Sequence, residues 1–211
     1  MNYEDFTMIQ EKDLPKRKST RLKNFDYSTV GAYFVTICVR DRMPILSEIA
    51  VGAEVGKDET GGGRGGACSS RMYPPSRVHT PSADFPEITL KLKPCGEIVK
   101  EQLELLENRF PSVTIDGYVI MPDHIHAVIF IHETTCGEEE KGGVSVTLDD
   151  VICAFKSLTS RICKQRCGIE KIFQRSYAEH IVRDKNDYET HMKYIYENPM
   201  RRYYKQLEGN E

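Results

Sequence analysis

His124 and His126 stand one residue apart within the largely apolar stretch 118–131. Side chains alternate between the two faces of a β-strand, so both imidazoles point to one side and Ile125 points to the other. Burying two imidazoles side by side is costly unless their nitrogens are satisfied, and a divalent metal ion would satisfy them. Two polar residues on the exposed face of a half-buried strand are the simpler explanation of so short a pattern. The pair therefore predicts a metal site only in combination with other residues.

A second group of polar residues follows later in the chain, on a predicted helix. His191, Tyr194 and Asn198 are spaced by three and four residues, so they share one face of that helix. A neighbouring apolar stripe, expected to pack inward, consists of Tyr188, Met192 and Ile195. If a metal binds the histidines, Tyr194 is a candidate nucleophile and Asn198 a candidate oxygen ligand. A half-buried tyrosine with a solvated hydroxyl is the alternative.

The elements that must position these residues alternate between strands and helices. We expect strands at 33–39, 113–120, 124–131 and 177–183, and helices at 96–110, after the cap Thr147, and from 186 or 187 to just before Pro199. The order βαββαβ plus one helix favours an α+β fold of the ferredoxin-like or RRM-like kind. Its four-stranded antiparallel sheet would carry two helices on one face. The other face would remain for the histidines and the last helix.

Apolar residues at helical spacing support the first two helices. The stripes are Val99, Leu103, Leu106 and Phe110, and then Val151, Phe155, Leu158 and Ile162. The last helix is expected to end before Pro199, because proline disfavours helical geometry in the residue that precedes it.

Composition divides the chain into one domain with appendages. Residues 52–66 hold seven of the fifteen glycines, and we predict a disordered insertion at 52–86 because such a segment buries too little apolar surface to order itself. The insertion interrupts a single domain at 29–205. A basic N-terminal arm at 1–28 precedes the domain and a tail at 206–211 follows it.

Charge and apolar content narrow the class of protein. No apolar run reaches membrane-spanning length and the N-terminus lacks signal-peptide features, so we expect a cytoplasmic protein without a membrane partner. Seven scattered cysteines indicate reduced thiols. The net charge is −3, yet residues 153–205 hold twelve Lys or Arg against six Asp or Glu. That bias, with the basic arm, is compatible with phosphate binding.

The motifs resemble those of a known family. His124-Ile-His126 within Met-Pro-Asp-His-Ile-His resembles the histidine–hydrophobic–histidine (HUH) motif of the HUH endonucleases. Residues 173–183, Asp187-Tyr188 and Tyr194-Ile-Tyr-Glu-Asn-Pro199 resemble the single-tyrosine, IS200-like transposases, and among these the REP-associated tyrosine transposases. The match runs from about residue 33 to residue 200. It implies that His124 and His126 bind the metal, that Tyr194 is the nucleophile, and that Asn198 stands where related enzymes often have glutamine.

The resemblance implies a DNA transposase or single-stranded DNA endonuclease that uses Mg²⁺ or Mn²⁺. It would cut single-stranded or hairpin DNA through a 5′-phosphotyrosine intermediate, as a monomer or homodimer. Two alternatives stay open. One is a non-catalytic single-stranded nucleic-acid-binding module on the same fold. The other is a metal-dependent hydrolase in which the tyrosine is passive.

Overall fold

The computed structural model describes residues 30–51, 88–133 and 146–209. The predicted N-terminal arm at 1–28 and the predicted insertion at 52–86 lie outside these residues, as do the last two residues of the predicted tail. The elements are β1 (Gly31–Cys38), the 3₁₀ turn η1 (Arg40–Arg42), β2 (Ser47–Val51), β3 (Ile88–Leu92), α1 (Pro94–Glu104), α2 (Leu106–Arg109), β4 (Val113–Ile120), β5 (His124–Ile131), α3 (Leu148–Cys167), β6 (Ala178–Val182) and α4 (Lys185–Leu207).

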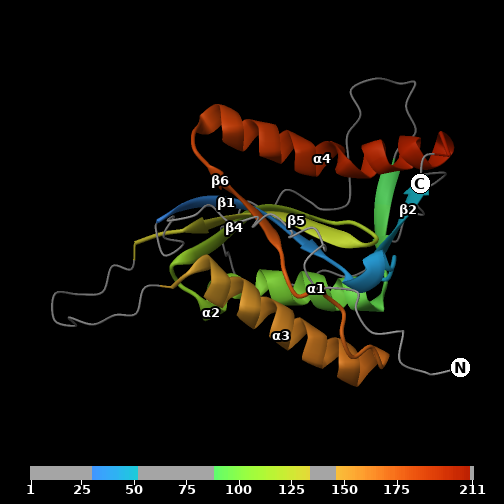
Figure 1. The fold of residues 1–211 in the computed structure, drawn as a ribbon, viewed down its shortest axis with the longest axis horizontal. Coiled ribbons are helices and arrows are strands. Elements are labelled where there is room, and N and C mark those ends of the chain that lie inside the picture. Colours follow the sequence, from blue (N-terminus) through green and yellow to red (C-terminus); the bar gives the residue numbers. More distant parts are fainter. Residues whose placement is uncertain (1–29, 52–87, 134–145, 210–211) are drawn as a thin grey trace, which may run out of the picture.

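The main sheet has four antiparallel strands in the order β4-β5-β1-β6. Figure 1 shows α1 and α3 against one face of this sheet and α4 across the opposite face. The predicted α+β fold with a four-stranded antiparallel sheet and a C-terminal helix is therefore confirmed. The predicted strands agree with β1, β4, β5 and β6 to within two residues at either end.

Each face of the sheet has its own hydrophobic core. The larger core lies between the sheet and the helices α1 and α3, and includes Val35, Ile125 and Phe155. The smaller core lies between the sheet and α4, and includes Phe34, Val128 and Ile195. Strand alternation explains the division, because Ile125 and Val128 occupy positions of opposite parity on β5. The histidines share parity with Val128 and therefore face α4.

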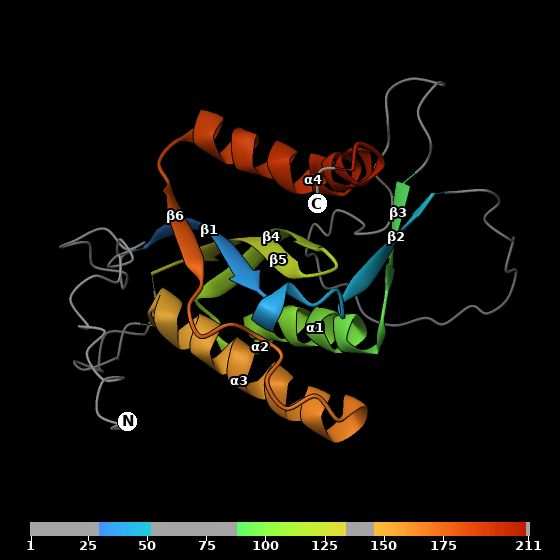
Figure 2. The same cartoon turned by 45° about the vertical axis from the view of Figure 1, so that its right-hand side comes forward.

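The predicted order missed a two-stranded hairpin formed by β2 and β3. Val51, the last residue of β2, pairs with Ile88, the first residue of β3, so the two described residues that flank segment 52–87 lie side by side. Ile49 and Leu90 pack against the smaller core. Figure 2 shows the hairpin at one end of the sheet, beside the C-terminal part of α4. The long separation in sequence explains why a local pattern did not reveal this pairing.

The helices on the other face partly follow their predicted stripes. Thr147 caps α3 as predicted, in a reciprocal capping box with Asp150. The predicted stripe of α3 is confirmed for Val151, Phe155 and Ile162, which pack in the larger core, but Thr159 and Cys163 are buried where the stripe had Leu158, which is half-buried. The predicted helix at 96–110 is broken at Leu105 into α1 and α2, although its apolar stripe does pack into the larger core.

The predicted end of the last helix before Pro199 is wrong, since α4 continues to Leu207. Proline inside a helix removes one hydrogen bond and crowds the carbonyl four residues earlier, which kinks the helix. Figure 2 shows the C-terminal turns of α4 at an angle to its N-terminal turns. Tertiary contacts offset the cost, because Asn198 and Pro199 are buried and Arg202 forms an ion pair with Asp123.

A glycine allows α4 to approach the sheet closely. A Cβ atom at Gly117 of β4 would lie 2.6 Å from Cε of Met192. Gly117 also adjoins the register shift in the pairing of β4 with β5. Tyr188 donates a hydrogen bond to Asp116 beside it, so the N-terminal half of α4 is anchored over β4.

None of the helices within the described ranges is long and apolar enough to cross a membrane. The cysteines in these ranges are free thiols: Cys38, Cys95, Cys153, Cys163 and Cys167.

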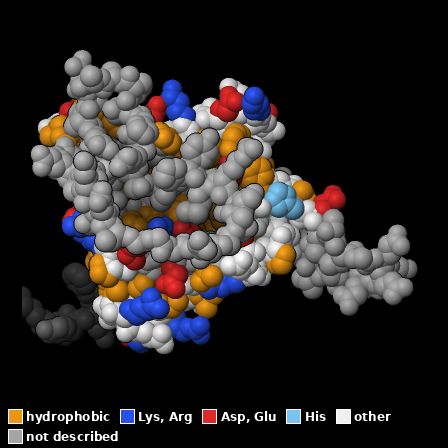
Figure 3. All heavy atoms as spheres, turned by 180° about the vertical axis from the view of Figure 1, so that it is seen from behind, with side chains coloured by type: hydrophobic (Ala, Val, Ile, Leu, Met, Phe, Trp, Pro, Cys, Tyr) orange, Lys and Arg blue, Asp and Glu red, His pale blue; other side chains and the backbone are white. Residues whose placement is uncertain are grey.

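On the coloured part of the face in Figure 3, basic side chains are interspersed with acidic ones.

Candidate active site

His124 and His126 lie on β5, buried beneath α4, with exposed fractions of 9% and 5%. Their ring centroids are 4.6 Å apart. Each Nδ1 has a polar partner. Asp123, the residue directly before His124, places Oδ1 2.8 Å from His124 Nδ1, and Thr36 on β1 places Oγ1 2.9 Å from His126 Nδ1. Thr36 reaches His126 because the two residues are paired in the β1–β5 register. Both rings are thus held at Nδ1, and Nε2 is the nitrogen left for another ligand.

His126 Nε2 is buried and has no hydrogen-bond partner in the described structure. Burial, followed by the charges of His124 and Arg42, lowers the pKa of His126 to about 3. The ring is therefore neutral near pH 7. A buried ring nitrogen without a partner is costly, and a neutral imidazole has a lone pair suited to a metal ion. The donor set at this position fits a divalent cation.

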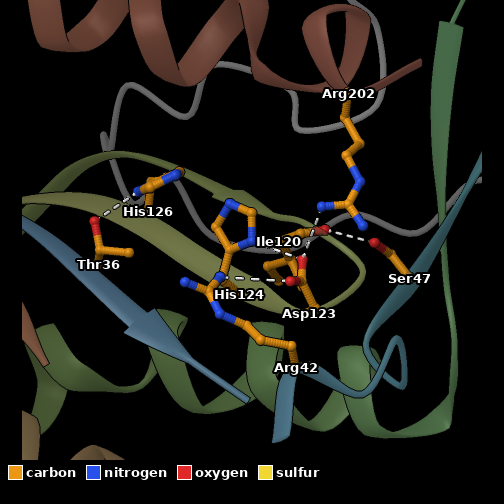
Figure 4. A network of polar contacts seen from close by, with 8 residues as sticks. All are labelled: Thr36, Arg42, Ser47, Ile120, Asp123, His124, His126 and Arg202. Atoms are coloured by element: carbon orange, nitrogen blue, oxygen red, sulfur yellow. Dashed lines mark hydrogen bonds and ion pairs between the residues drawn. The ribbon is translucent and has the colours of Figure 1, made fainter. Parts of the chain in front are cut away.

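The turn before β5 carries a carboxylate between two arginines (Figure 4). Asp123 Oδ2 lies 3.4 Å from an Arg42 guanidinium nitrogen, and Asp123 Oδ1 lies 3.8 Å from one of Arg202. Burial by itself would raise the pKa of Asp123, but the hydrogen bond with His124 and the nearby positive charges outweigh it and lower that pKa. Asp123 is thus an ionised acceptor that orients His124, as carboxylates do behind metal-binding histidines.

Backbone contacts fix this turn in place. Val39 N–H donates to the Asp123 carbonyl at 2.9 Å, and Leu46 N–H donates to the Pro122 carbonyl at 3.0 Å. Ser47 Oγ donates to the Ile120 carbonyl at 2.8 Å. The segment that leads from β1 to β2 therefore holds the turn from both sides. This segment also includes Arg42, whose φ of 53° is in the left-handed region.

Tyr194 lies beside the histidines. Its ring centroid is 5.1 Å from that of His126 and 6.0 Å from that of Phe34, both edge-to-face. Arg201 lies over the Tyr194 ring at 5.8 Å. The side chain is 37% exposed, so the ring touches the buried imidazole while part of it remains open to solvent. Tyr196 has a similar exposure of 39%, but has no ring contact with either histidine among the described residues.

Asn198 occupies the same face of α4 one turn after Tyr194 and is 7% exposed. In the described part of the chain it makes no hydrogen bond to either histidine. The structure therefore brings His124, His126 and Tyr194 together, and places Asn198 on the buried face of α4 without a hydrogen bond to the pair among the described residues.

Sequence analysis missed the residues that hold the site: Thr36, Arg42, Asp123 and Arg202. Asp123 carried a usable signal, because an acid directly before two histidines in an apolar stretch has an unusual position. Thr36 lies at the site because of the β1–β5 register, and Arg42 because of a left-handed turn. Arg202 lies there because α4 continues beyond Pro199. No local spacing encodes those features.

The fold and the site define an α+β protein in which a strand with paired histidines faces a helix that carries a tyrosine. No family model matches the chain. It is 27% identical over 195 residues to an uncharacterized protein of Haemophilus influenzae, covering 87% of this chain and 88% of that one. A solved structure of a REP-associated tyrosine transposase bound to a REP hairpin has 18% identity and a TM-score of 0.46, covering 86% of this chain and 74% of the other.

The chain is also 30% identical over 90 residues to the REP-associated tyrosine transposase of Escherichia coli. The match covers 41% of this chain and 44% of that transposase, less than half of either. Over this part of its length the chain is thus homologous to a REP-associated tyrosine transposase, and the resemblance predicted from its motifs is confirmed.

Proposed function

We propose that this protein is a single-tyrosine HUH transposase or endonuclease that cuts and rejoins single-stranded DNA at or near hairpins. The observation that carries the proposal is the contact between Tyr194 and the buried His126, whose Nε2 has no partner in the described structure. Homology to a tyrosine transposase supports it. The element order and the strand order β4-β5-β1-β6 support a ferredoxin-like scaffold, with the extra helix α4 carrying the nucleophile.

The proposed metal ligands are His124 Nε2, His126 Nε2 and the side-chain oxygen of Asn198. A bound Mg²⁺ or Mn²⁺ ion would polarise a non-bridging phosphate oxygen, and the two imidazoles favour Mn²⁺. Asp123 and Thr36 would fix the ring orientations by accepting hydrogen bonds from the Nδ1–H groups. Asn198 is included because it is buried on the same face of α4 as Tyr194, one turn further along.

The proposed reaction at Tyr194 is a phosphoryl transfer. Tyr194 gives up its hydroxyl proton to solvent as its oxygen attacks phosphorus, a bond from phosphorus to Oη forms, and the bond from phosphorus to the 3′ oxygen breaks. The 3′ oxygen leaves with a proton as a hydroxyl, and the 5′ phosphate stays on Tyr194. Because a phosphodiester is kept, a 3′-hydroxyl of another end can reverse the step, which amounts to strand transfer. Arg201, over the Tyr194 ring, is placed to attract the phosphate backbone.

Two tyrosines of one helix give a matched test of the nucleophile. Tyr194 and Tyr196 are 37% and 39% exposed, but lie about 200° apart around α4, so only one can face a given phosphate. Labelled hairpin oligonucleotides with single-stranded flanks, copied from palindromes beside the gene, would be incubated with Mn²⁺ and each Tyr→Phe variant. A denaturing gel then detects the covalent adduct.

We expect an adduct with the wild type and with Tyr196→Phe, and at least a hundredfold less with Tyr194→Phe. Binding of the oligonucleotide should persist in Tyr194→Phe, because the change removes one oxygen and little volume. EDTA should abolish the adduct. An adduct that survives Tyr194→Phe would disprove the role of this residue. DNA binding without any adduct in the wild type would instead indicate a non-catalytic binding module.

A further inference from the structure

We propose that His180, Asp187 and His191 form a second divalent-metal site, separate from the paired histidines of β5. His180 lies on β6, and the other two residues lie in the first two turns of α4. One ligand atom from each of the three residues lies within 4.8 Å of the others. The site would take a first-row transition ion.

The distances agree with coordination around one ion. Asp187 Oδ1 lies 3.2 Å from His180 Nε2 and 3.2 Å from His191 Nε2. Ligands bound at about 2.0–2.1 Å with angles of 90–110° lie roughly 2.9–3.4 Å from one another. Both nitrogen–oxygen distances, each 3.2 Å, thus lie within the range expected for two ligands of one ion. Only the two imidazoles would need to adjust relative to each other.

The surroundings hold these groups in position. Asp187 Oδ2 accepts a hydrogen bond from the Arg183 backbone N–H at 3.1 Å, which orients the carboxylate. The His191 ring stacks on Phe34 with a centroid distance of 4.3 Å. His180 and His191 have ring centroids 4.6 Å apart at an angle of 52°, so the two rings are tilted and not stacked. Contacts of this kind around the ligands are typical of metal sites.

Two nitrogens and one carboxylate oxygen determine which ion fits. Such a set suits Zn²⁺, Co²⁺ or Mn²⁺ and leaves coordination positions open, whereas Mg²⁺ prefers oxygen ligands. The three side chains also form an ordinary polar network, in which the His180 imidazole hydrogen-bonds to the Asp187 carboxylate and His191 lies within ion-pair distance of it. Metal titration separates the two cases, because the network alone binds no ion.

The second site has a structural role. It joins β6 to the start of α4, and His191 precedes Tyr194 by one turn on the same helix face. An ion held there would fasten the N-terminal half of α4 to the sheet. Phe34 stacks on both His191 and His126, with centroid distances of 4.3 Å and 5.2 Å, so the two proposed sites share one aromatic neighbour.

Co²⁺ is a suitable probe because its visible absorption distinguishes nitrogen and oxygen ligands from thiolates. The full chain, free of any histidine tag, would be titrated by calorimetry and followed by absorption. The variants are His180→Gln, Asp187→Asn, and the double change His124→Ala with His126→Ala. His132→Gln is the matched control, since His132 directly follows β5 and lies outside both proposed sites, where its Nε2 contacts Thr114 Oγ1. Circular dichroism would verify that each variant is folded.

We expect two non-thiolate Co²⁺ ions per chain for the wild type and His132→Gln, and one for each of the other variants. A single such ion in the wild type that is also bound by His180→Gln and Asp187→Asn would overturn the proposal. So would undiminished binding in both His180→Gln and Asp187→Asn, or complete loss of binding in the double variant. The count of bound ions does not depend on DNA cleavage, so failure of this proposal and failure of the proposed transposase activity are distinguishable.

Discussion

The two histidines of β5 differ in their surroundings although they occupy equivalent positions on one strand. His124 faces an ionised carboxylate at 2.8 Å, whereas His126 faces a neutral threonine hydroxyl at 2.9 Å. His126 is also the more buried of the two. Protonation of His126 therefore places a positive charge where little compensates it. The sequence shows two equal residues, and only strand register and burial distinguish them.

This difference predicts acid sensitivity of the metal-free protein. The pKa of His126 is about 3 in the folded chain against 6.5 for an ordinary histidine, so between these values the unfolded chain binds more protons. The stabilisation is complete above about pH 6.5 and is lost as the pH falls. At pH 5 the expected loss from this one group is about 2 kcal/mol.

Urea unfolding at pH 7 and pH 5, in EDTA, measures this effect. The conservative variant His126→Gln lacks the titrating group and should lose about 2 kcal/mol less than the wild type over the same interval. Equal losses in the two proteins would show that His126 does not control the acid response.

At the scale of elements, local signals placed the four strands of the main sheet to within two residues, but not the end of the last helix. Thr147 is a good cap because its side chain accepts from the Asp150 N–H while Asp150 accepts from the Thr147 N–H. A cap depends only on neighbours in sequence, so the pattern predicted Thr147 at this position, although not its reciprocal bonds with Asp150. Pro199 carries an equally clear local signal for the end of a helix. There the contacts of α4 with the sheet prevail, and those contacts cannot be read from spacing.

The capping box gives a prediction for α3. Thr147→Ala removes the side-chain acceptor at the N-terminus of the helix and should lower the free energy of unfolding by about 1 kcal/mol. In a domain of this size the melting temperature should fall by roughly 2–4 °C. Scanning calorimetry measures the change, and Thr147→Ser, which keeps the hydroxyl, should restore most of it. A wild-type melting point in Thr147→Ala would mean that the cap contributes nothing.

At the scale of the whole molecule, much of the arrangement follows from element order. The order βαββαβ predicted a sheet with helices on one face and room for the histidines and last helix on the other. The β2–β3 hairpin did not follow from that order, because its strands are brief and far apart in sequence. The partners of the site residues needed the folded register, as with Thr36 opposite His126.

The hairpin provides a test of the predicted insertion at 52–86. Val51 and Ile88 are paired, so a two-residue Asn-Gly turn can join β2 to β3 directly. A chain in which this turn replaces 52–87 should keep its melting temperature within about 3 °C, since loop length costs little entropy. A fall of 10 °C or more would mean that the segment contributes to packing. Loss of the covalent DNA adduct at unchanged stability would assign the segment to DNA binding.

The division into two cores has a consequence for how heat inactivates the protein. The histidines belong to a strand whose other face packs into the larger core, while Tyr194 belongs to a helix that rests on the smaller one. Parts of a protein with few apolar contacts open at a lower free-energy cost than its main core. Loosening of α4 separates the tyrosine from the histidines while the sheet, α1 and α3 stay folded. If the proposed reaction takes place, its loss on heating should therefore precede bulk melting, because the proposed nucleophile and the proposed metal ligands lie on opposite sides of the smaller core.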